Sequence, residues 1–310
     1  MRAARLYAPG DLRVEDVPRP EPGPGDVLVE VEVALTDGTD LKTFRRGHPL
    51  LARESPSPFG HEFCGILDGR RVVAANSAPC GACDGCARGE QCRDLVFVAG
   101  AYAEAVLVPE RIARVNLHAV PPRLEPHVAA MVEPLACCLH GVERAGVEAG
   151  QTVAILGAGP IGLMLATCVA DAGGWPIVVG GRRERQELVR EFGAETGDGR
   201  GTDVVVEAAG TEGAWVDAQQ LVRPGGTVVL FGGLPRDSRP PLYAYRLHYE
   251  ELTIRGSFHH TPQTVRAALM FLASAAYPWE RLVTHQVGLE ALPALFANPP
   301  RDLLKAAVVP

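Results

Sequence analysis

Two patterns of apolar and polar positions divide the chain. In roughly the first 110 residues, short segments of β character are broken by glycine and proline, and residues 27–35 (VLVEVEVAL) alternate apolar with acidic positions. A half-buried strand has this alternation. From about residue 133 onward, near-continuous apolar runs alternate with segments of helical periodicity. These runs, which are typical of strands buried on both faces of a parallel sheet, are residues 152–156, 176–180, 203–210 and 226–233.

The repeated strand–helix pattern predicts an α/β fold with a doubly wound parallel sheet of the Rossmann type. We expect this dinucleotide-binding domain at residues 136–259. A β-rich domain is expected from residues 1–135 together with residues 260–310. In that second part, residues 262–276 have a helical pattern, and the closing segment LKAAVV predicts a strand that returns to the first domain.

One connection in the expected sheet is unusually short. Only the stretch FGAETGDGRG separates the helix that follows Arg183 from the strand at 203–210. The length of this stretch leaves little room for a full crossover. We therefore expect one strand–helix unit to be missing from the dinucleotide-binding domain.

Composition and charge exclude several classes of function. The 310 residues carry a net charge of −7 and contain no basic block, which argues against nucleic acid and anionic membranes as partners. No apolar run reaches the roughly 18 residues of a membrane span. The amino-terminal segment lacks the apolar stretch of a signal peptide. We expect a cytoplasmic protein that acts on a small molecule.

A glycine-rich turn directly follows the predicted strand TVAIL. In this G-x-G-x-x-G turn, Gly157 permits tight reversal, Gly159 lets a pyrophosphate approach the backbone, and Gly162 lets the helix pack closely on the strand. The amino terminus of that helix then faces the phosphates. A structural turn that binds nothing is the alternative. The predicted cofactor-binding residues of this turn are Gly157, Gly159, Pro160, Ile161 and Gly162.

The end of the next predicted strand bears on cofactor choice. It reads Gly180, Gly181, Arg182 and Arg183, where an NAD-selective site normally places a carboxylate for the ribose hydroxyl. Guanidinium groups instead suit a 2′-phosphate. We predict that Gly181, Arg182 and Arg183 bind the cofactor and that NADP is preferred over NAD. The alternative is a solvated helix start in which Glu184 pairs with either arginine.

Four cysteines lie close together in a C-x2-C-x2-C-x5-C arrangement. They are Cys80, Cys83, Cys86 and Cys92. In a reducing compartment, clustered thiols are metal ligands more often than disulfides. Four thiolates suit tetrahedral zinc, and a site without an open position is structural. We therefore predict a structural zinc lobe at residues 80–92; the alternatives are a redox disulfide set and a lobe without metal.

Together with further motifs, these features resemble the zinc-containing medium-chain alcohol and polyol dehydrogenases, the family of sorbitol, threonine and glucose dehydrogenases. The motifs are ARLYAPGDLRVEDVP, Gly60-His61-Glu62, the cysteine lobe, Glu133-Pro134-Leu135-Ala136, the glycine-rich turn, RPGGTVVLFG and ELTIRGSF. The resemblance runs nearly from end to end. It implies a GroES-like catalytic domain beside the Rossmann domain, with the active site where nicotinamide meets zinc.

The resemblance also implies a catalytic zinc with an altered first ligand. The family usually has cysteine in a Cys-Gly-Thr/Ser-Asp motif, whereas residues 37–40 read Asp-Gly-Thr-Asp. Asp37 therefore stands where the thiolate is expected; carboxylate oxygen also binds zinc and makes the site harder. His61 and either Glu62 or Glu133 would complete the ligands and leave one position open. One alternative is that Asp-Gly-Thr-Asp is a simple turn. Another is a nucleotide-sensing protein without catalysis, in which Asp37 abolishes zinc binding.

Further roles follow from the same resemblance. Thr39 matches the family's relay hydroxyl, and Lys42 occupies the position where many relatives carry a relay histidine. Glu62 is assigned to catalysis as well as to the metal. Asp40 is expected to orient the ligands, and Lys305 to contact the cofactor phosphates.

The implied reaction is hydride transfer between a secondary alcohol and NADP(H) or NAD(H). Zinc lowers the pKa of the bound alcohol, and the alkoxide then releases hydride to the nicotinamide. A polyol, sugar or cyclitol is the expected substrate. The alternatives are a threonine-type amino-alcohol dehydrogenase and a zinc-independent NADPH quinone or enone reductase. We expect a homo-oligomer, either a dimer or a tetramer.

Overall fold

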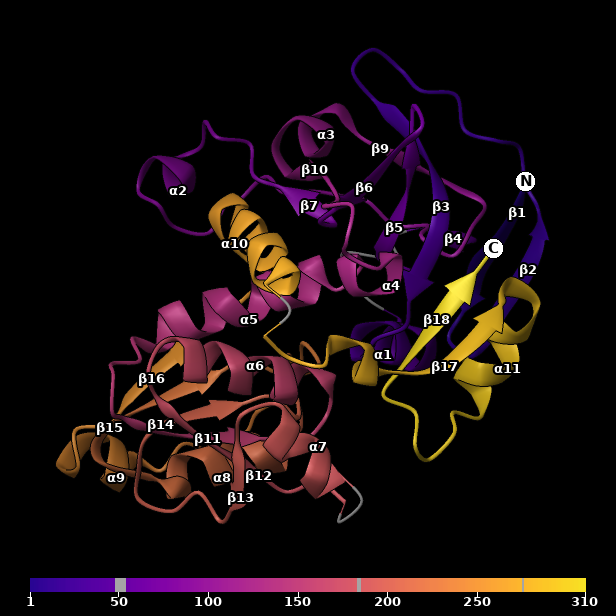
Figure 1. Ribbon diagram of the computed structural model, residues 1–310. Coiled ribbons are helices and arrows are strands. Elements are labelled where there is room, and N and C mark those ends of the chain that lie inside the picture. The colour runs from indigo at the N-terminus through magenta and orange to yellow at the C-terminus, as the bar shows by residue number, and fades with distance from the viewer. Residues whose placement is uncertain (48–53, 183–184, 275) are drawn as a thin grey trace. The chain divides into compact units, whose positions relative to one another are not determined.

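The chain folds into two compact units, each with its own sheets (Figure 1). One unit contains residues 1–133 and 261–310, and the other contains residues 134–260. The computed structural model describes residues 1–47, 54–182, 185–274 and 276–310. Arg183 and Glu184 lie outside the described residues. None of the described helices combines the length and apolar character that a membrane crossing requires.

The first unit consists mainly of short strands. Its strands are β1 (Arg2–Ala8), β2 (Asp11–Asp16), β3 (Val27–Leu35), β4 (Ser57–Pro58), β5 (Glu62–Leu67), β6 (Arg70–Ala74), β7 (Ser77–Ala78), β8 (Val96–Phe97), β9 (Ala105–Val108), β10 (Leu117–Ala119), β17 (Val283–Gly288) and β18 (Lys305–Val309). Its helices are α1 (Gly38–Arg46), α2 (Asp84–Ala87), α3 (Glu110–Asn116), α4 (Pro126–Ala129), α10 (Pro262–Ala273) and α11 (Leu292–Ala297), with the 3-10 helices η2 (Trp279–Leu282) and η3 (Leu289–Ala291).

A seven-stranded sheet organises this unit. Its order is β10-β6-β5-β3-β18-β17, and β9 also pairs with β3. The long strand β3 forms because its valines alternate inward with acidic residues outward, as predicted; Val29 is buried and Glu30 is exposed. The predicted closing strand is β18, which pairs with β3 near the point where β3 ends (Figure 1).

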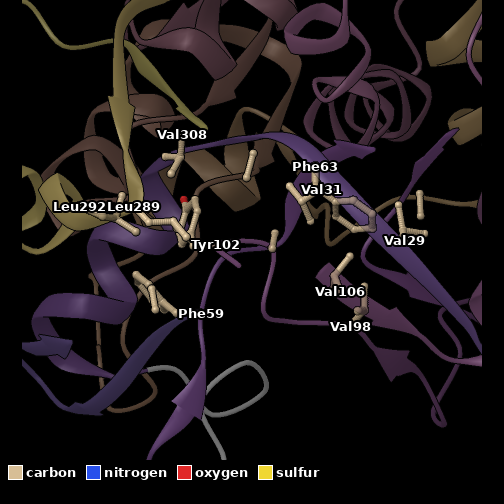
Figure 2. Packing of buried hydrophobic residues seen from close by; sticks show 14 of the residues in the cluster. Val29, Val31, Phe59, Phe63, Val98, Tyr102, Val106, Leu289, Leu292 and Val308 are labelled. Atoms are coloured by element: carbon tan, nitrogen blue, oxygen red, sulfur yellow. The ribbon is translucent and has the colours of Figure 1, made fainter. Parts of the chain in front are cut away.

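Apolar side chains from this sheet form the core that supports the candidate site. Val29, Val31, Phe63 and Val106 pack in one cluster with Tyr102, whose ring is fully buried (Figure 2). Burying one such side chain contributes about 1.5–3 kcal/mol. The strand ends that carry the polar side chains described below are therefore held in place by packed, apolar neighbours.

The second unit is a layered α/β structure. Its elements are α5 (Val132–Ala145, which begins in the first unit), β11 (Thr152–Leu156), α6 (Pro160–Asp171), β12 (Trp175–Val179), α7 (Gln186–Glu191), β13 (Glu195–Gly197), β14 (Thr202–Glu207), α8 (Glu212–Leu221), β15 (Val222–Leu230), α9 (Ala244–Tyr249) and β16 (Thr253–Gly256). The sheet order is β13-β12-β11-β14-β15-β16, and neighbouring strands are parallel. The strand order reverses direction at β11, which is where such sheets bind dinucleotides. The predicted fold class is confirmed.

The sequence predicted that one strand and one helix would be missing from this sheet. The prediction is wrong for the strand. β13 is present and pairs with β12. What is absent is the crossover helix, because residues 198–201, all of them described, lead to β14 through a turn. Gly199 makes this short crossing feasible, since a Cβ there would lie 2.6 Å from Val179 Cγ2 and 2.9 Å from Ala154 Cβ. The turn therefore packs flat on the sheet.

A carboxylate joins β14 to its neighbours in this sheet. Asp203 Oδ2 accepts hydrogen bonds from the backbone N–H and the hydroxyl of Thr152, each at 2.8 Å. Asp203 Oδ1 accepts from Arg223 Nε at 2.8 Å. The hydrogen bond from Arg223, followed by that from Thr152, lowers the pKa of Asp203.

We expect Asp203→Ala to lower the free energy of unfolding at pH 7 by about 2 kcal/mol, because hydrogen bonds to a charged group contribute about 1.5–3 kcal/mol. Since the folded-state pKa is depressed, this contribution is present above the unfolded-state pKa and is lost as pH falls through the folded-state value. Denaturant unfolding at pH 7 and pH 3 measures the difference. Asp198→Ala, at an exposed position, is the control; equal deficits of Asp203→Ala at both pH values would contradict the assignment.

Candidate metal and dinucleotide sites

Asp37 lies two residues after the end of β3 and caps the amino terminus of α1. Its Oδ1 accepts a hydrogen bond of 2.7 Å from Asp40 N, which satisfies one of the free N–H groups of the helix. The helix dipole favours a carboxylate at this position. Its other oxygen, Oδ2, lies 3.9 Å from His61 Nε2. One oxygen therefore serves the helix cap, and the other faces the histidine.

His61 and Glu62 come to the same place because of strand pairing. β3 and β5 are antiparallel, and Leu35 pairs with Glu62. The residues that follow β3 therefore meet the residues that begin β5. Ligand atoms of Asp37, His61 and Glu62 lie within 4.8 Å of one another. The structure therefore brings together three of the four residues predicted to bind the catalytic zinc. The fourth, Glu133, is buried in the first turn of α5.

The electrostatics of this cluster fit a divalent cation. Burial raises the pKa of Glu62 to about 8, although Lys305 opposes this shift. Burial by itself lowers the pKa of His61. The carboxylates of Asp40 and Asp37, with a further contribution from Glu133, outweigh burial and raise this pKa well above its usual value. Without a metal, burial thus favours a proton on Glu62, and the neighbouring carboxylates favour one on His61. A cation would displace these protons, as metals do when they bind imidazole and carboxylate.

Lys305 forms a buried ion pair with Glu62. Its Nζ donates to Glu62 Oε1 at 2.8 Å and to Oε2 at 2.6 Å, and it also lies 3.3 Å from Thr36 O. The side chains of Lys305 and Glu62 are 1% and 0% exposed. The expected contact between Lys305 and the cofactor phosphates stays a prediction. The ion pair with Glu62 was not predicted, because the depth of β18 in the sheet is not visible in the sequence.

Asp40 links His61 to a tyrosine that sequence reasoning did not select. Asp40 Oδ1 lies 3.0 Å from His61 Nδ1, and Tyr102 donates a hydrogen bond to Asp40 Oδ2. With Nδ1 engaged, Nε2 remains for a metal, which is the usual arrangement of a histidine ligand. The position of Asp40 agrees with the orienting role expected of it.

The predicted relay residues lie on the helix that Asp37 caps. Thr39 is in the first turn of α1, partly exposed, and its backbone N–H is among the groups that favour the ionised form of Asp37. Lys42 follows within the same helix and is half-buried. Their contact with a substrate stays a prediction.

The cysteine lobe has the dimensions of a zinc–thiolate site. Sγ–Sγ separations are 3.9 Å for Cys80–Cys86, 3.6 Å for Cys83–Cys86, 3.9 Å for Cys83–Cys92 and 3.6 Å for Cys80–Cys92. A tetrahedron with Zn–S bonds of about 2.3 Å has edges of about 3.8 Å. Backbone N–H groups of Arg93 and Cys86 lower the pKa of the Cys83 thiol to about 6. The four residues therefore fit a zinc ion.

The glycine-rich turn has the geometry that a pyrophosphate needs. A Cβ at Gly162 would lie 1.8 Å from Gly157 O, so only glycine allows α6 to begin so close to β11. Gly159 is the amino-terminal cap of α6, and no atom lies within 4 Å of the place where its Cβ would be. Pro160 and Ile161 form the first turn of α6. The backbone N–H groups at this helix end are thus open to an anion.

Among the described residues, two arginines follow the end of β12 closely. Arg182 is exposed, and Gly181 before it approaches Ala158 of the glycine-rich turn. Arg185, which sequence reasoning did not select, donates from Nη1 to Ala158 O at 3.0 Å. Burial, followed by the charge of Arg182, lowers the pKa of Arg185. Positive charge therefore gathers beside the turn, where an adenosine phosphate would lie.

The two overlooked residues differ in the signals that the sequence offered. Arg185 is three positions after Arg182, so a cluster of arginines after the predicted strand was visible in the sequence. Tyr102 lies in a stretch of small residues, Gly100 to Ala103. A tyrosine buried there must find a hydrogen-bond partner, but the sequence does not say which one.

Two parts of the chain match known families. Residues 23–121 match the family described as alcohol dehydrogenase GroES-like domain, and residues 195–274 match the family described as zinc-binding dehydrogenase. Sorbitol dehydrogenase of Bacillus subtilis is 29% identical over 327 residues, covering 94% of this chain and 91% of that protein. Erythritol/L-threitol dehydrogenase of Mycolicibacterium smegmatis is 30% identical over 337 residues, covering 93% of this chain and 91% of that protein.

Solved structures share the fold over the whole chain. One is described as a zinc-binding dehydrogenase of Sinorhizobium meliloti 1021 bound to NADP; it is 33% identical, has a TM-score of 0.88, and the match covers 100% of this chain and 99% of that one. Alcohol dehydrogenase of Thermus sp. ATN1 is 28% identical with a TM-score of 0.82 and the same coverage.

We expect Lys305→Met to lower the free energy of unfolding of the metal-free protein by about 3–5 kcal/mol, because it leaves a buried carboxylate without its partner. Denaturant unfolding in the presence of a chelator measures this loss. Adding Glu62→Gln to Lys305→Met should recover most of it. The control is Arg13→Met, which breaks the exposed ion pair with Asp11 and should cost less than about 1 kcal/mol. Equal losses in the two single variants would contradict the interpretation.

Proposed function

Because this chain belongs to the zinc-type medium-chain alcohol and polyol dehydrogenase family, we propose that it transfers hydride between a secondary alcohol of a polyol, sugar or cyclitol and NADP(H). The family resemblance predicted from the motifs is confirmed. The protein is an oxidoreductase acting on CH–OH groups, and it uses zinc and a nicotinamide cofactor. The substrate class, the preference for NADP and the residue roles are proposals.

The observation that carries this proposal is the buried group of Asp37, His61 and Glu62. Their ligand atoms lie within 4.8 Å of one another, and they offer carboxylate and imidazole donors of the kind that catalytic zinc uses. In the proposal, Asp37 and His61 hold the zinc, and Glu62 or Glu133 is the third ligand. Bound zinc supplies a Lewis acid that lowers the pKa of an alcohol.

The proton released by the alcohol needs a path to water. Thr39 is partly exposed at the start of α1, two residues after Asp37, and its hydroxyl can accept this proton and donate its own. Lys42, on the same helix, is proposed to contact the substrate or to continue the relay. Relays of this kind keep the alcohol oxygen deprotonated while hydride leaves.

The cofactor is proposed to bind along the carboxyl end of the second unit's sheet. The backbone between Gly157 and Gly162 would receive the pyrophosphate, and Arg182 would receive the 2′-phosphate of NADP. Gly181 leaves room beside the turn. The proposed contact of Arg183 falls outside the described residues. NAD is the alternative cofactor.

An oxygen-rich metal site supports a polyhydroxylated substrate, because carboxylate ligands leave a harder metal than thiolate does. Relatives that act on sorbitol and on erythritol or L-threitol support the same class. A threonine-type amino-alcohol is not favoured by these relatives, whose names refer to polyols. A zinc-independent reductase is not favoured, since it needs neither the cysteine lobe nor the buried ligand group. A cytoplasmic location and a homo-oligomeric state, dimer or tetramer, complete the proposal.

The zinc site is tested by Asp37→Ala. We expect the parent to bind about two zinc ions per chain and to oxidise members of a panel of sugars, polyols and amino-alcohols with NADP. Asp37→Ala should retain only the zinc of the cysteine lobe and lose at least about 100-fold in kcat/KM, because removing a ligand would weaken zinc binding and with it the Lewis acid that activates the alcohol. Metal analysis and steady-state kinetics measure both, with Asp198→Ala as the control. A parent with one zinc, or equal turnover by Asp37→Ala, would overturn the proposal.

Cofactor choice is tested by Arg182→Ala. The ratio of kcat/KM with NADP to that with NAD should fall about 10- to 100-fold, since a charge-assisted contact of about 1.5–3 kcal/mol is lost. Arg200→Ala, which removes another exposed arginine of the same unit, should leave the ratio unchanged. If Arg182→Ala has the ratio of the parent, Arg182 does not select the cofactor.

A further inference from the structure

One buried residue, Asp40, contacts two of the proposed zinc ligands, Asp37 through its backbone and His61 through its carboxylate. Asp40 N donates to Asp37 Oδ1 at 2.7 Å, and Asp40 Oδ1 lies 3.0 Å from His61 Nδ1. The side chain of Asp40 is 2% exposed. Rotation of this carboxylate would therefore be transmitted directly to the imidazole ring of His61.

Tyr102 is positioned to prevent that rotation. Its hydroxyl donates to Asp40 Oδ2, the oxygen that His61 does not use, and lies 3.0 Å from Leu35 O. The ring is fully buried, with Phe59 and Phe296 at centroid distances of 5.6 and 6.1 Å. Burial and then the charge of Asp40 raise the pKa of Tyr102 well above its usual value, so that the phenol keeps its proton and remains a donor.

The backbone ties Tyr102 to the segment that carries His61. Gly100 N and Ala101 N donate to Gly60 O at 2.9 and 3.1 Å, and Tyr102 N donates to Phe59 O at 3.1 Å. A Cβ at Gly60 would lie 2.6 Å from the Tyr102 ring. The ring therefore packs directly on the residue before His61.

A small cavity next to Asp40 leaves room for its carboxylate to move. A cavity of about 10 Å³ is lined by Asp40, Thr43, Phe59 and His61, among others, a space close to the smallest that admits a water molecule. Thr43 lines this cavity, and its hydroxyl is buried and has no hydrogen-bond partner among the described residues. If the bond from Tyr102 were lost, Asp40 could turn toward the Thr43 hydroxyl and draw away from His61.

We propose that Tyr102 is a positioning residue of the zinc centre, which through Asp40 fixes the His61 ring with Nε2 directed at the metal. This inference rests on the proposed function, because it presupposes zinc at Asp37 and His61. Tyr102 itself touches neither metal nor substrate. Its effect should therefore appear first in metal affinity and in the geometry of the bound ion.

The experiment uses Tyr102→Phe, which keeps the ring and removes only the hydroxyl. Zinc affinity of the Asp37–His61 site is measured by competition with a chromophoric chelator. The visible spectrum of the Co²⁺-substituted protein reports ligand geometry without any turnover. We expect zinc affinity about 10- to 100-fold below that of the parent, the range that outer-shell partners typically control, together with altered Co²⁺ bands and retention of the cysteine-lobe zinc.

The matched control is Tyr7→Phe. Tyr7 also donates to a carboxylate, that of Glu15 at 2.9 Å, but on the outer strands β1 and β2. This control should leave zinc affinity and the Co²⁺ spectrum unchanged. Asp40→Asn should weaken zinc binding as Tyr102→Phe does. The double variant should be no worse than Asp40→Asn alone, because Tyr102 acts through Asp40.

The outcomes separate this inference from the proposed function. A parent with zinc only in the cysteine lobe would overturn the proposed function. A parent with both zinc ions, combined with parental affinity and spectrum in Tyr102→Phe, would overturn the positioning role alone. Additive losses in the double variant would also overturn it. So would loss of both zinc ions from Tyr102→Phe, since the hydroxyl would then support the fold rather than one ligand.

Discussion

The burial of carboxylates around one imidazole is the constraint on which the candidate site depends. Removing a charged group from water is costly unless a counter-charge or hydrogen bonds replace the water. Each acidic side chain here has a different partner in place of water. Glu62 pairs with Lys305, Asp40 accepts a hydrogen bond from Tyr102, and Asp37 accepts one from the amino terminus of α1. Close antiparallel strands make this concentration of charge feasible, because β3 and β5 hold their ends at fixed separation. A divalent cation is the remaining compensating charge that such a cluster can accept.

Patterns within single segments predicted most of the fold. The alternation in residues 27–35 predicted β3 at its observed bounds, and the apolar run at 152–156 predicted β11. The spacing of the four cysteines predicted a lobe whose sulfur atoms have the separations of a tetrahedral zinc site. These features succeed because each depends on residues close together in sequence, where periodicity and turn chemistry decide the structure.

The contacts that sequence reasoning missed depend on residues far apart in the chain. Lys305 meets Glu62 only because β18 returns to pair with β3, and Tyr102 meets Asp40 only because its loop crosses the start of β5. The short stretch at 192–201 was predicted to lack a strand as well as a helix. Strand β13 is present because its three residues are enough to pair with β12. Gly199 then lets the chain cross the sheet without a helix. Pattern alone does not contain such packing information.

The replacement of a thiolate by Asp37 has a structural reason in this chain. Asp is among the preferred residues at the amino-terminal cap of a helix, because its short carboxylate can accept from the first free N–H groups. Burial opposes the ionised form of Asp37, but His61, Lys305 and these N–H groups together lower its pKa. A cysteine at this position would be a weaker acceptor for Asp40 N. Asp37 thus fixes α1 with one oxygen and leaves the other, already charged and directed toward His61, as a metal donor.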